Sequence, residues 1–362
     1  MSHPHPRLAE KFRRGGWLPA NREVLEKWHK SKVEKTKKRQ ATFLPPIQEL
    51  KEMIENDGDM YMAFNRMFEN PTLVKDYKQL LELMNDILTE APFYGDLGPP
   101  FYMILAGPMN TDAGFTAFLA DKLNAQFKKN LRHMDGLPRF PSICSRPQRR
   151  SRWLIFRCDP SHPQWGFTSW DDFFVRQFND NIRCVELPEE HNVISAACES
   201  VFYNKQENVQ LMDEFWIKGE PYSLQHMLNH DKDYGHLFTG GSVFQGFLQV
   251  TGYHRWHSPV DGKIMKIVTV PGTYFVQSPA LLNSTSDHNP YLQSLAFITA
   301  MTTRMLIFIE SSNPAIGLMC FIAIGMTEVS TGNALGVIER GDFHGVRIDW
   351  WWVWICQLVD AN

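Results

Sequence analysis

Residues 253–270 read YHRWHSPVDGKIMKIVTV and combine a histidine pair, a turn and a strand in one short stretch. The Asp-Gly pair at 261–262 marks the turn, and the alternation over 263–270 predicts a strand with one buried face. His254 and His257 stand three residues apart just before that turn, where an imidazole can transfer protons near neutral pH. A purely structural interpretation makes them polar residues satisfied at a sheet edge.

Further strands are predicted on either side of this stretch. Residues 243–250, 305–309 and 316–324 are apolar and rich in strand-forming residues, and Ser-Ser-Asn-Pro at 311–314 predicts a hairpin between the last two. The second half of the chain therefore reads as a mostly antiparallel sheet.

The first half has helical periodicity instead. Ile47, Leu50 and Ile54 share one face of a helix that follows a Pro-Pro pair, and residues 77–88 repeat the pattern. Residues 116–129 predict one further helix. Helices followed by strands indicate the α+β class.

Composition limits the function classes. The 37 basic and 40 acidic residues give a net charge of −3, which argues against a nucleic-acid partner. The most apolar stretch, 295–326, contains Arg304, Glu310 and a turn, so no transmembrane segment is expected. The six cysteines form no CxxC pair and the N-terminus is polar, which predicts a cytoplasmic, reducing location.

Several motifs resemble the phosphatidylserine decarboxylase family. The run at 253–262 is similar to its Tyr-His-Arg-x-His-x-Pro-x-x-Gly signature, and residues 167–178 are similar to its SxxxFFxRxL element. Weaker likenesses lie at 194–200, 271–275 and 324–327. Residues 91–100, 195–200 and 325–331 resemble the fungal L-tryptophan decarboxylase branch of the psilocybin pathway most closely.

The resemblance implies an organisation of the chain. It covers a helical N-terminal domain at 43–131 and a phosphatidylserine-decarboxylase-like catalytic domain at 165–342. Composition predicts the other segments: a basic flexible arm at 1–42, an irregular linker at 132–164 and an aberrant Trp-rich tail at 343–362.

The resemblance also implies a chemistry. Family members cleave themselves at a serine, which becomes a pyruvoyl group, and this ketone forms a Schiff base with the substrate amine before CO2 leaves. The implied substrate is an amino acid such as tryptophan or the phospholipid phosphatidylserine. By position, His257 would be the base in self-cleavage and His254 the proton donor in decarboxylation. Glu199 would replace the family aspartate, with Asp261 as a weaker alternative.

The serine itself has no match. The family's cleavage motif is Gly-Ser-Ser or Gly-Ser-Thr after a Gly-Asp turn, and neither follows residue 342. Gly240-Gly241-Ser242 precedes the histidine motif, so cleavage there would not separate the histidines from the new terminus. We therefore expect no pyruvoyl group and no self-cleaved subunits in this chain. The tail from 343 is either an aromatic strand or membrane-interface anchor or, as we favour, a translated intron.

Three alternatives stay open at this point. The chain could be a non-catalytic remnant or binding protein, which the missing serine favours. A carrier domain would need Lys266 at a hairpin tip, but the pattern places it within a strand. A zinc site would need partners for His226 and His230, and the sequence offers no HExxH or cysteine ligands, so no metal is expected.

Overall fold

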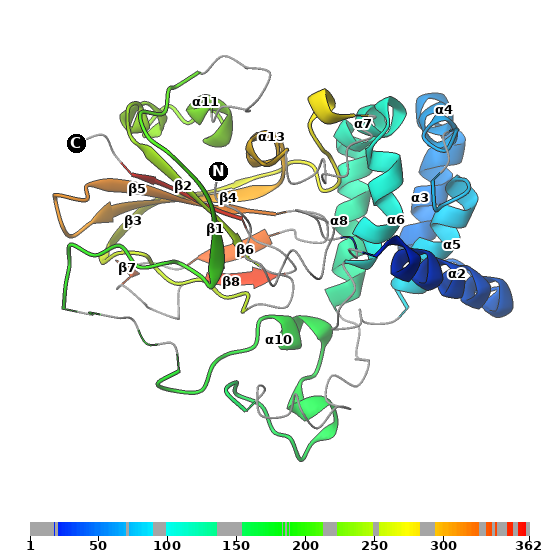
Figure 1. Cartoon of the computed structure of the whole chain (residues 1–362), viewed down its shortest axis with the longest axis horizontal. Coiled ribbons are helices and arrows are strands. Elements are labelled where there is room, and N and C mark those ends of the chain that lie inside the picture. The colour runs from blue at the N-terminus through cyan, green and yellow to red at the C-terminus, as the bar shows by residue number, and fades with distance from the viewer. Residues whose placement is uncertain are drawn as a thin grey trace. The chain divides into compact units, whose positions relative to one another are not determined.

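A computed structural model of the chain shows two compact units (Figure 1). The helical unit comprises His3–Ile143 and Thr273–Ile298, and the sheet unit comprises Cys144–Gly272 and Thr299–Asn362. The structure describes residues 18, 21–69, 72–89, 99–135, 154–182, 184, 187, 189–212, 223–248, 253–282, 294–325, 331–334, 337–338, 346–349 and 354–359. Residues 273–298, which the sequence analysis assigned to the catalytic domain, thus belong to the helical unit.

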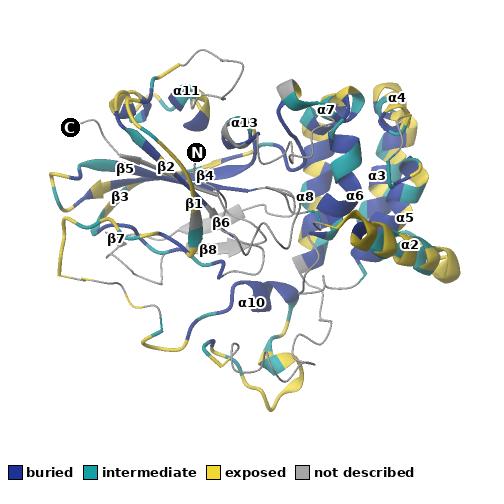
Figure 2. Cartoon of the chain, in the orientation of Figure 1, coloured by how far each residue is buried: buried dark blue, intermediate teal, exposed yellow. Residues whose placement is uncertain are grey.

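The helical unit packs its predicted apolar faces inward. Ile47, Leu50 and Ile54 are all fully buried, as expected from their spacing, and Figure 2 shows the buried faces of these helices in dark blue. Its described helices are α2 (Arg22–Arg39), α3 (Pro45–Asn56), α4 (Gly58–Arg66), α5 (Tyr77–Ile87), α6 (Pro100–Met109), α7 (Asp112–Leu119) and α8 (Asp121–Asp135).

Side chains at helix N-termini explain where several of these helices begin. Asp57 accepts a hydrogen bond from the backbone N–H of Met60 at the start of α4, and Asp76 accepts one from Gln79 at the start of α5. Each bond satisfies a donor that the first helical turn leaves without a partner. These caps fix the helix boundaries that apolar periodicity leaves loosely defined.

The single helix predicted over 116–129 is wrong, because two helices occupy this region. Chain direction changes at Ala120, between α7 and α8, and the amide of Asn124 donates hydrogen bonds to the carbonyl oxygens of Phe118 and Ala120. The apolar period continues through the break without a glycine or proline, so local sequence gives no stop signal.

The flexible arm predicted for 1–42 is wrong over its second half, where α2 forms. Asn21 caps this helix, and its only fully enclosed apolar side chain among those described is Leu25. Its anchor is electrostatic: Lys32 Nζ lies 2.7 Å and Lys35 Nζ 3.2 Å from the carboxylate of Asp86, a buried residue of α5. A long-range ion cluster thus joins α5 to a helix that has no continuous apolar stripe.

The sheet unit is built on seven strands in the order β1-β2-β9-β5-β4-β3-β7, and every neighbouring pair is antiparallel. The strands are β1 (Ser200–Gln206), β2 (Ser242–Leu248), β3 (Gly262–Val270), β4 (Arg304–Ser311), β5 (Leu318–Ile324), β7 (Val337–Ile338) and β9 (Trp354–Val359). A separate antiparallel pair joins β6 (Thr331–Ala334) to β8 (Val346–Asp349). The α+β prediction is confirmed.

Short helices accompany this sheet. In Figure 1, α10 (Trp170–Phe174) and α11 (Leu224–Met227) lie on opposite sides of it. The 3-10 turns η2 (Pro163–Gly166) and η3 (Gly235–Phe238) belong to the same unit, and η4 (Pro279–Leu281) to the helical unit. Along the chain, α13 (Leu295–Met301) crosses the boundary between the units.

The hairpin between β4 and β5 forms where the sequence predicts it. Backbone N–H groups of Ile316 and Gly317 donate to the carbonyl oxygen of Asn313, and Gly317 adopts a φ of +68° that favours glycine. Both strands are almost entirely buried along their length, which matches their continuous apolar runs. They form the centre of the sheet against which the histidine motif packs.

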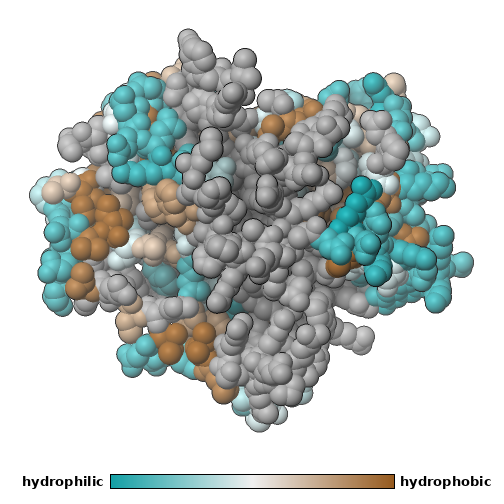
Figure 3. All heavy atoms as spheres, viewed as in Figure 1, coloured by the Kyte–Doolittle hydropathy of each residue, from teal (hydrophilic) through white to brown (hydrophobic). Residues whose placement is uncertain are grey.

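Apolar side chains also reach the surface (Figure 3). Phe202 of β1 and Phe244 of β2 form an exposed ring pair with centroids 5.4 Å apart.

The tail predicted to be aberrant, 343–362, contributes β8 and β9, and β9 pairs with β2 and β5. Residues 341–345 and 350–353 lie outside the described residues, and the aberrant origin of this tail stays a prediction.

Candidate functional site

The histidine motif forms an extended segment directly before β3. Trp256 is buried against Phe321 of β5, with ring centroids 4.6 Å apart, so the motif lies on the sheet. His254 is 1% exposed, whereas His257 is partly accessible. The two imidazoles therefore occupy different environments although they are three residues apart.

Backbone hydrogen bonds join this motif to the segment that contains Glu199. The N–H of His257 donates to the carbonyl oxygen of Ala197 at 2.8 Å, and the N–H of Ser195 donates to that of Pro259 at 2.9 Å. The structure thus brings together two segments that the sequence analysis assigned to one site, although about sixty residues separate them.

The second family-like element, 167–178, contacts the histidine motif through His254 and Arg255. Ser169 caps α10 by accepting a hydrogen bond from the N–H of Asp172. The imidazole of His254 stacks on Phe174 with centroids 4.1 Å apart, and Arg255 Nε donates to the carbonyl oxygen of Val175 at 2.7 Å. Stacking and this charge-assisted bond fix both motifs against each other.

A column of aromatic rings continues from this contact. Tyr253 stacks on Phe178 at 3.9 Å between centroids, and Phe178 stacks on Phe156 at 4.8 Å. The ring centroids of His257 and Tyr253 lie 6.1 Å apart, and the two ring planes are inclined by only 11°. The partly accessible imidazole is therefore held parallel to the end of a rigid column.

A buried cation lies within the same cluster. The guanidinium of Arg176 sits 4.5 Å from the centroid of Phe156 and 5.0 Å from that of Phe173, and it donates to the carbonyl oxygen of Phe173 at 3.3 Å. Arg176 was not among the predicted site residues, although it lies within the family-like element 167–178. Phe156 had no detectable signal, because it stands in an irregular Arg-rich stretch.

Electrostatics distinguish the chemically active groups. Burial, with a smaller contribution from the Arg255 charge, lowers the pKa of His257 to about 4, so its imidazole is neutral at pH 7 and able to accept a proton. Cys198 lies in the segment that is hydrogen-bonded to the histidine motif. Burial raises the pKa of its thiol to about 12, which keeps the thiol protonated and unreactive. At pH 7, His257 therefore has an unprotonated ring nitrogen, whereas the Cys198 sulfur keeps its proton.

The two candidate carboxylates have different surroundings. Glu199 is exposed, and its charge makes only the smallest contribution to the raised pKa of Tyr253, which burial dominates. The carboxylate of Asp261 instead lies 2.8 Å from Nδ1 of His191.

The groups considered for other chemistries lie elsewhere. His226 and His230 have ring centroids 5.5 Å apart, and His230 Nδ1 bonds to the side-chain amide of Gln225. Within the described part of the chain, no three His, Cys, Asp or Glu side chains gather to hold a metal. Lys266 lies within β3 and pairs with Asp231 and Asp233 rather than standing at a hairpin tip.

Two stretches bear on the serine that would form the pyruvoyl group implied by the resemblance. Residues 343–362 contain neither serine nor threonine. Ser242, the rejected substitute, begins β2 before the histidine motif. The strand end expected at 324–327 is described only through Gly325, and the Gly-Asp turn at 341–342 lies outside the described residues.

Comparisons with known proteins agree with the motifs. A phosphatidylserine decarboxylase model matches residues 170–332 and a second model of that description matches residues 44–134. "L-tryptophan decarboxylase" of Psilocybe cyanescens is 41% identical over 93% of this chain and 86% of its own length. The enzyme of the same name from Psilocybe cubensis is 39% identical over the same shares.

More distant relatives match less of the chain. "Decarboxylase iboD" of Amanita muscaria is 43% identical over 51% of this chain and 54% of its own length. "Phosphatidylserine decarboxylase proenzyme 2" of rice is 28% identical over 50% of this chain and 27% of its own length. Among the described residues, no helix is long and apolar enough to cross a membrane.

Proposed function

The chain belongs to the phosphatidylserine decarboxylase family, and on that premise we propose that its scaffold serves the decarboxylation of a free aromatic amino acid such as tryptophan. The observation that supports this proposal most directly is the share of the chain that aligns with each relative. The two Psilocybe enzymes named L-tryptophan decarboxylase align with 93% of the chain, whereas the rice phosphatidylserine decarboxylase proenzyme aligns with half of it. By family, the chain is a carboxy-lyase.

We assign roles to the site residues by their surroundings. His257 is neutral and partly accessible, which suits a base that takes a proton during self-cleavage. His254 is buried and held flat on Phe174, which suits a group that delivers a proton at one fixed position. Glu199 supplies negative charge on the side of the motif joined to His257.

This 362-residue polypeptide is proposed to remain uncleaved and inactive, because no hydroxyl residue occurs after residue 342. The same observation supports a second candidate function, a non-catalytic remnant or binding protein that keeps the decarboxylase scaffold. The two candidates differ in what happens when a Gly-Ser-Ser segment is supplied.

The first experiment is a denaturing gel of the purified chain. A single band near 42.0 kDa is expected. Two fragments would contradict the proposal that this polypeptide is not self-processed.

The second experiment replaces residues 343–362 with the corresponding segment of a Psilocybe relative. The chimaera is expected to give two fragments and to release CO2 from L-tryptophan but not from phosphatidylserine vesicles. His257→Asn should leave a single band, and His254→Asn should give two fragments without CO2 release. The exposed His236→Asn is the matched control and should change neither result. A chimaera that folds but neither cleaves nor releases CO2 would favour the non-catalytic remnant.

A further inference from the structure

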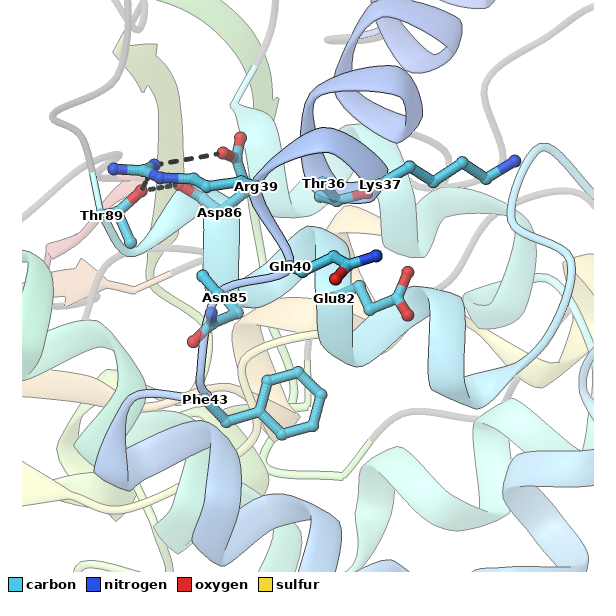
Figure 4. Close-up of a pocket in the computed structure, with 10 residues that line it drawn as sticks. Thr36, Lys37, Arg39, Gln40, Phe43, Glu82, Asn85, Asp86 and Thr89 are labelled. Carbon is cyan, nitrogen blue, oxygen red and sulfur yellow. Dashed lines mark hydrogen bonds and ion pairs between the residues drawn. The ribbon is translucent and has the colours of Figure 1, made fainter.

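The helical unit contains a cavity that the decarboxylase chemistry does not use. It has a volume of about 450 Å³ and lies between the C-terminal end of α2 and the exposed edge of α5 (Figure 4). Pockets that hold small molecules typically measure roughly 300–1,000 Å³. The cavity is therefore large enough for a ligand of amino-acid size.

One wall of this cavity is fixed by interactions within the protein. Arg39 lies 3.7 Å from the carboxylate of Asp86 and donates to the hydroxyl of Thr89 at 3.0 Å, as the dashed lines in Figure 4 mark. Asn85 accepts a hydrogen bond from the N–H of Leu44 at 2.8 Å, which ties the chain after α2 to α5. These side chains line the cavity, and their polar groups already have partners within the protein.

The opposite side offers polar groups to a ligand. Lys37, Gln40 and Glu82 line the cavity, and Figure 4 draws them away from the Arg39–Asp86 pair. Lys37 and Glu82 are exposed, so each can exchange water for a ligand without the cost of a buried, unmatched charge. Phe43 adds a half-buried aromatic ring to the same lining.

We propose that this cavity binds a free α-amino acid with an apolar side chain. Lys37 would bind the carboxylate, Glu82 the ammonium group, and the ring of Phe43 would contact the apolar side chain, with Gln40 as an adaptable hydrogen-bond partner. A simple anion would meet Glu82, and a simple cation would meet Lys37. The lining therefore selects a zwitterion over either single charge.

Binding at this site would be linked to the docking of α2. Lys37 and Gln40 belong to the end of this helix, whereas Glu82 belongs to α5, so the cavity exists only while the Asp86 cluster holds the two together. A bound amino acid is expected to stabilise docked α2 by mass action. The site thus senses amino-acid concentration independently of the histidine motif.

Calorimetric titration of the full chain with L-tryptophan tests the proposal. Tryptamine, which lacks the carboxylate, and indole-3-propionate, which lacks the ammonium group, should each bind at least about tenfold more weakly, because each loses one charge-assisted contact. Lys37→Met and Glu82→Gln should each weaken L-tryptophan binding by about the same factor.

Lys30→Met and Glu34→Gln are the matched controls, since both remove an exposed charge of α2 that does not line the cavity. They should leave the affinity within about twofold. Absence of binding, equal binding of the three compounds, or L-tryptophan binding unchanged in both Lys37→Met and Glu82→Gln would overturn the proposal. The last result would place the binding elsewhere, and its response to His254→Asn would then test the proposed catalytic site separately.

Discussion

The imidazole of His254 lies face to face with the ring of Phe174, with centroids 4.1 Å apart and planes inclined by 25°. The two residues come from the two most family-like motifs of the chain, which are eighty positions apart. Their contact joins the segment before β3 to α10, so each motif fixes the orientation of the other. A change in either ring is expected to loosen the whole site.

Phe174→Ala should destabilise the chain strongly, because Phe174 is almost completely buried and its removal leaves a cavity beneath His254. We expect a loss of about 3–5 kcal/mol in the free energy of unfolding, measured by urea denaturation. Phe202→Ala is the control, since Phe202 is 47% exposed, and it should cost less than about 1 kcal/mol. Equal losses of unfolding free energy in the two variants would show that Phe174, packed beneath His254, stabilises the chain no more than an exposed phenylalanine does.

Asp86→Asn should release α2 from the helical unit. The carboxylate balances Lys32, Lys35 and Arg39, and the amide cannot, so three cations would face one another without an anion. Hydrogen exchange of the α2 amides should accelerate at least about tenfold, and in the unaltered chain it should accelerate with rising salt. Asp59→Asn, an exposed change on α4, should leave α2 protected. Unchanged protection in Asp86→Asn would refute the electrostatic anchor.

Stability should fall as the pH is lowered through the range set by His257. Its pKa in the folded chain is about 4, below the value of about 6.5 for the unfolded chain, so the unfolded state binds the proton first. The contribution is fully present above about pH 6.5 and declines towards pH 4, by up to about 3 kcal/mol. Urea denaturation at successive pH values measures it.

His257→Asn should flatten this part of the pH profile, whereas His236→Asn, which removes an exposed imidazole, should leave it unchanged. A profile that keeps its slope in His257→Asn would assign the effect to another group.

Gly262→Ala should disturb the turn into β3. A Cβ atom at this position would overlap the backbone carbonyl of Glu310 on β4, which cannot move without breaking the strand pairing. We expect a loss of more than about 1 kcal/mol in unfolding free energy. At Gly58, an added Cβ meets nothing within 4 Å, so Gly58→Ala should be neutral or stabilising by up to about 1 kcal/mol. The comparison separates the clash from the general effect of replacing glycine.

The strands could be predicted from sequence because their signals are local. The alternation over 263–270 and the Ser-Ser-Asn-Pro turn each define their structure within a few residues. The strand and the hairpin both form, although only Val270 on the inner face of β3 is fully buried. Helix α2 could not be predicted in this way, because its ordering depends on Asp86, which lies about fifty positions further along the chain.

Part of the candidate site could also be predicted from the sequence. His254, His257 and the segment of Glu199 were identified by resemblance, and the structure joins their segments by backbone hydrogen bonds. The ring column with Phe156 was not predictable, because stacking between distant residues leaves no periodic trace in the sequence. The catalytic roles of His254, His257 and Glu199 stay predictions.

The way α2 is held has a consequence for how its sequence can vary in evolution. Lys32, Lys35 and Arg39 follow a helical spacing along one stripe, while the helix buries only Leu25 among its described apolar residues. Selection for docking would then act on that cationic stripe and on its acidic counterpart in α5. Apart from the buried Leu25 and the proposed ligand contact Lys37, the remaining positions of this helix are expected to vary freely among homologous sequences.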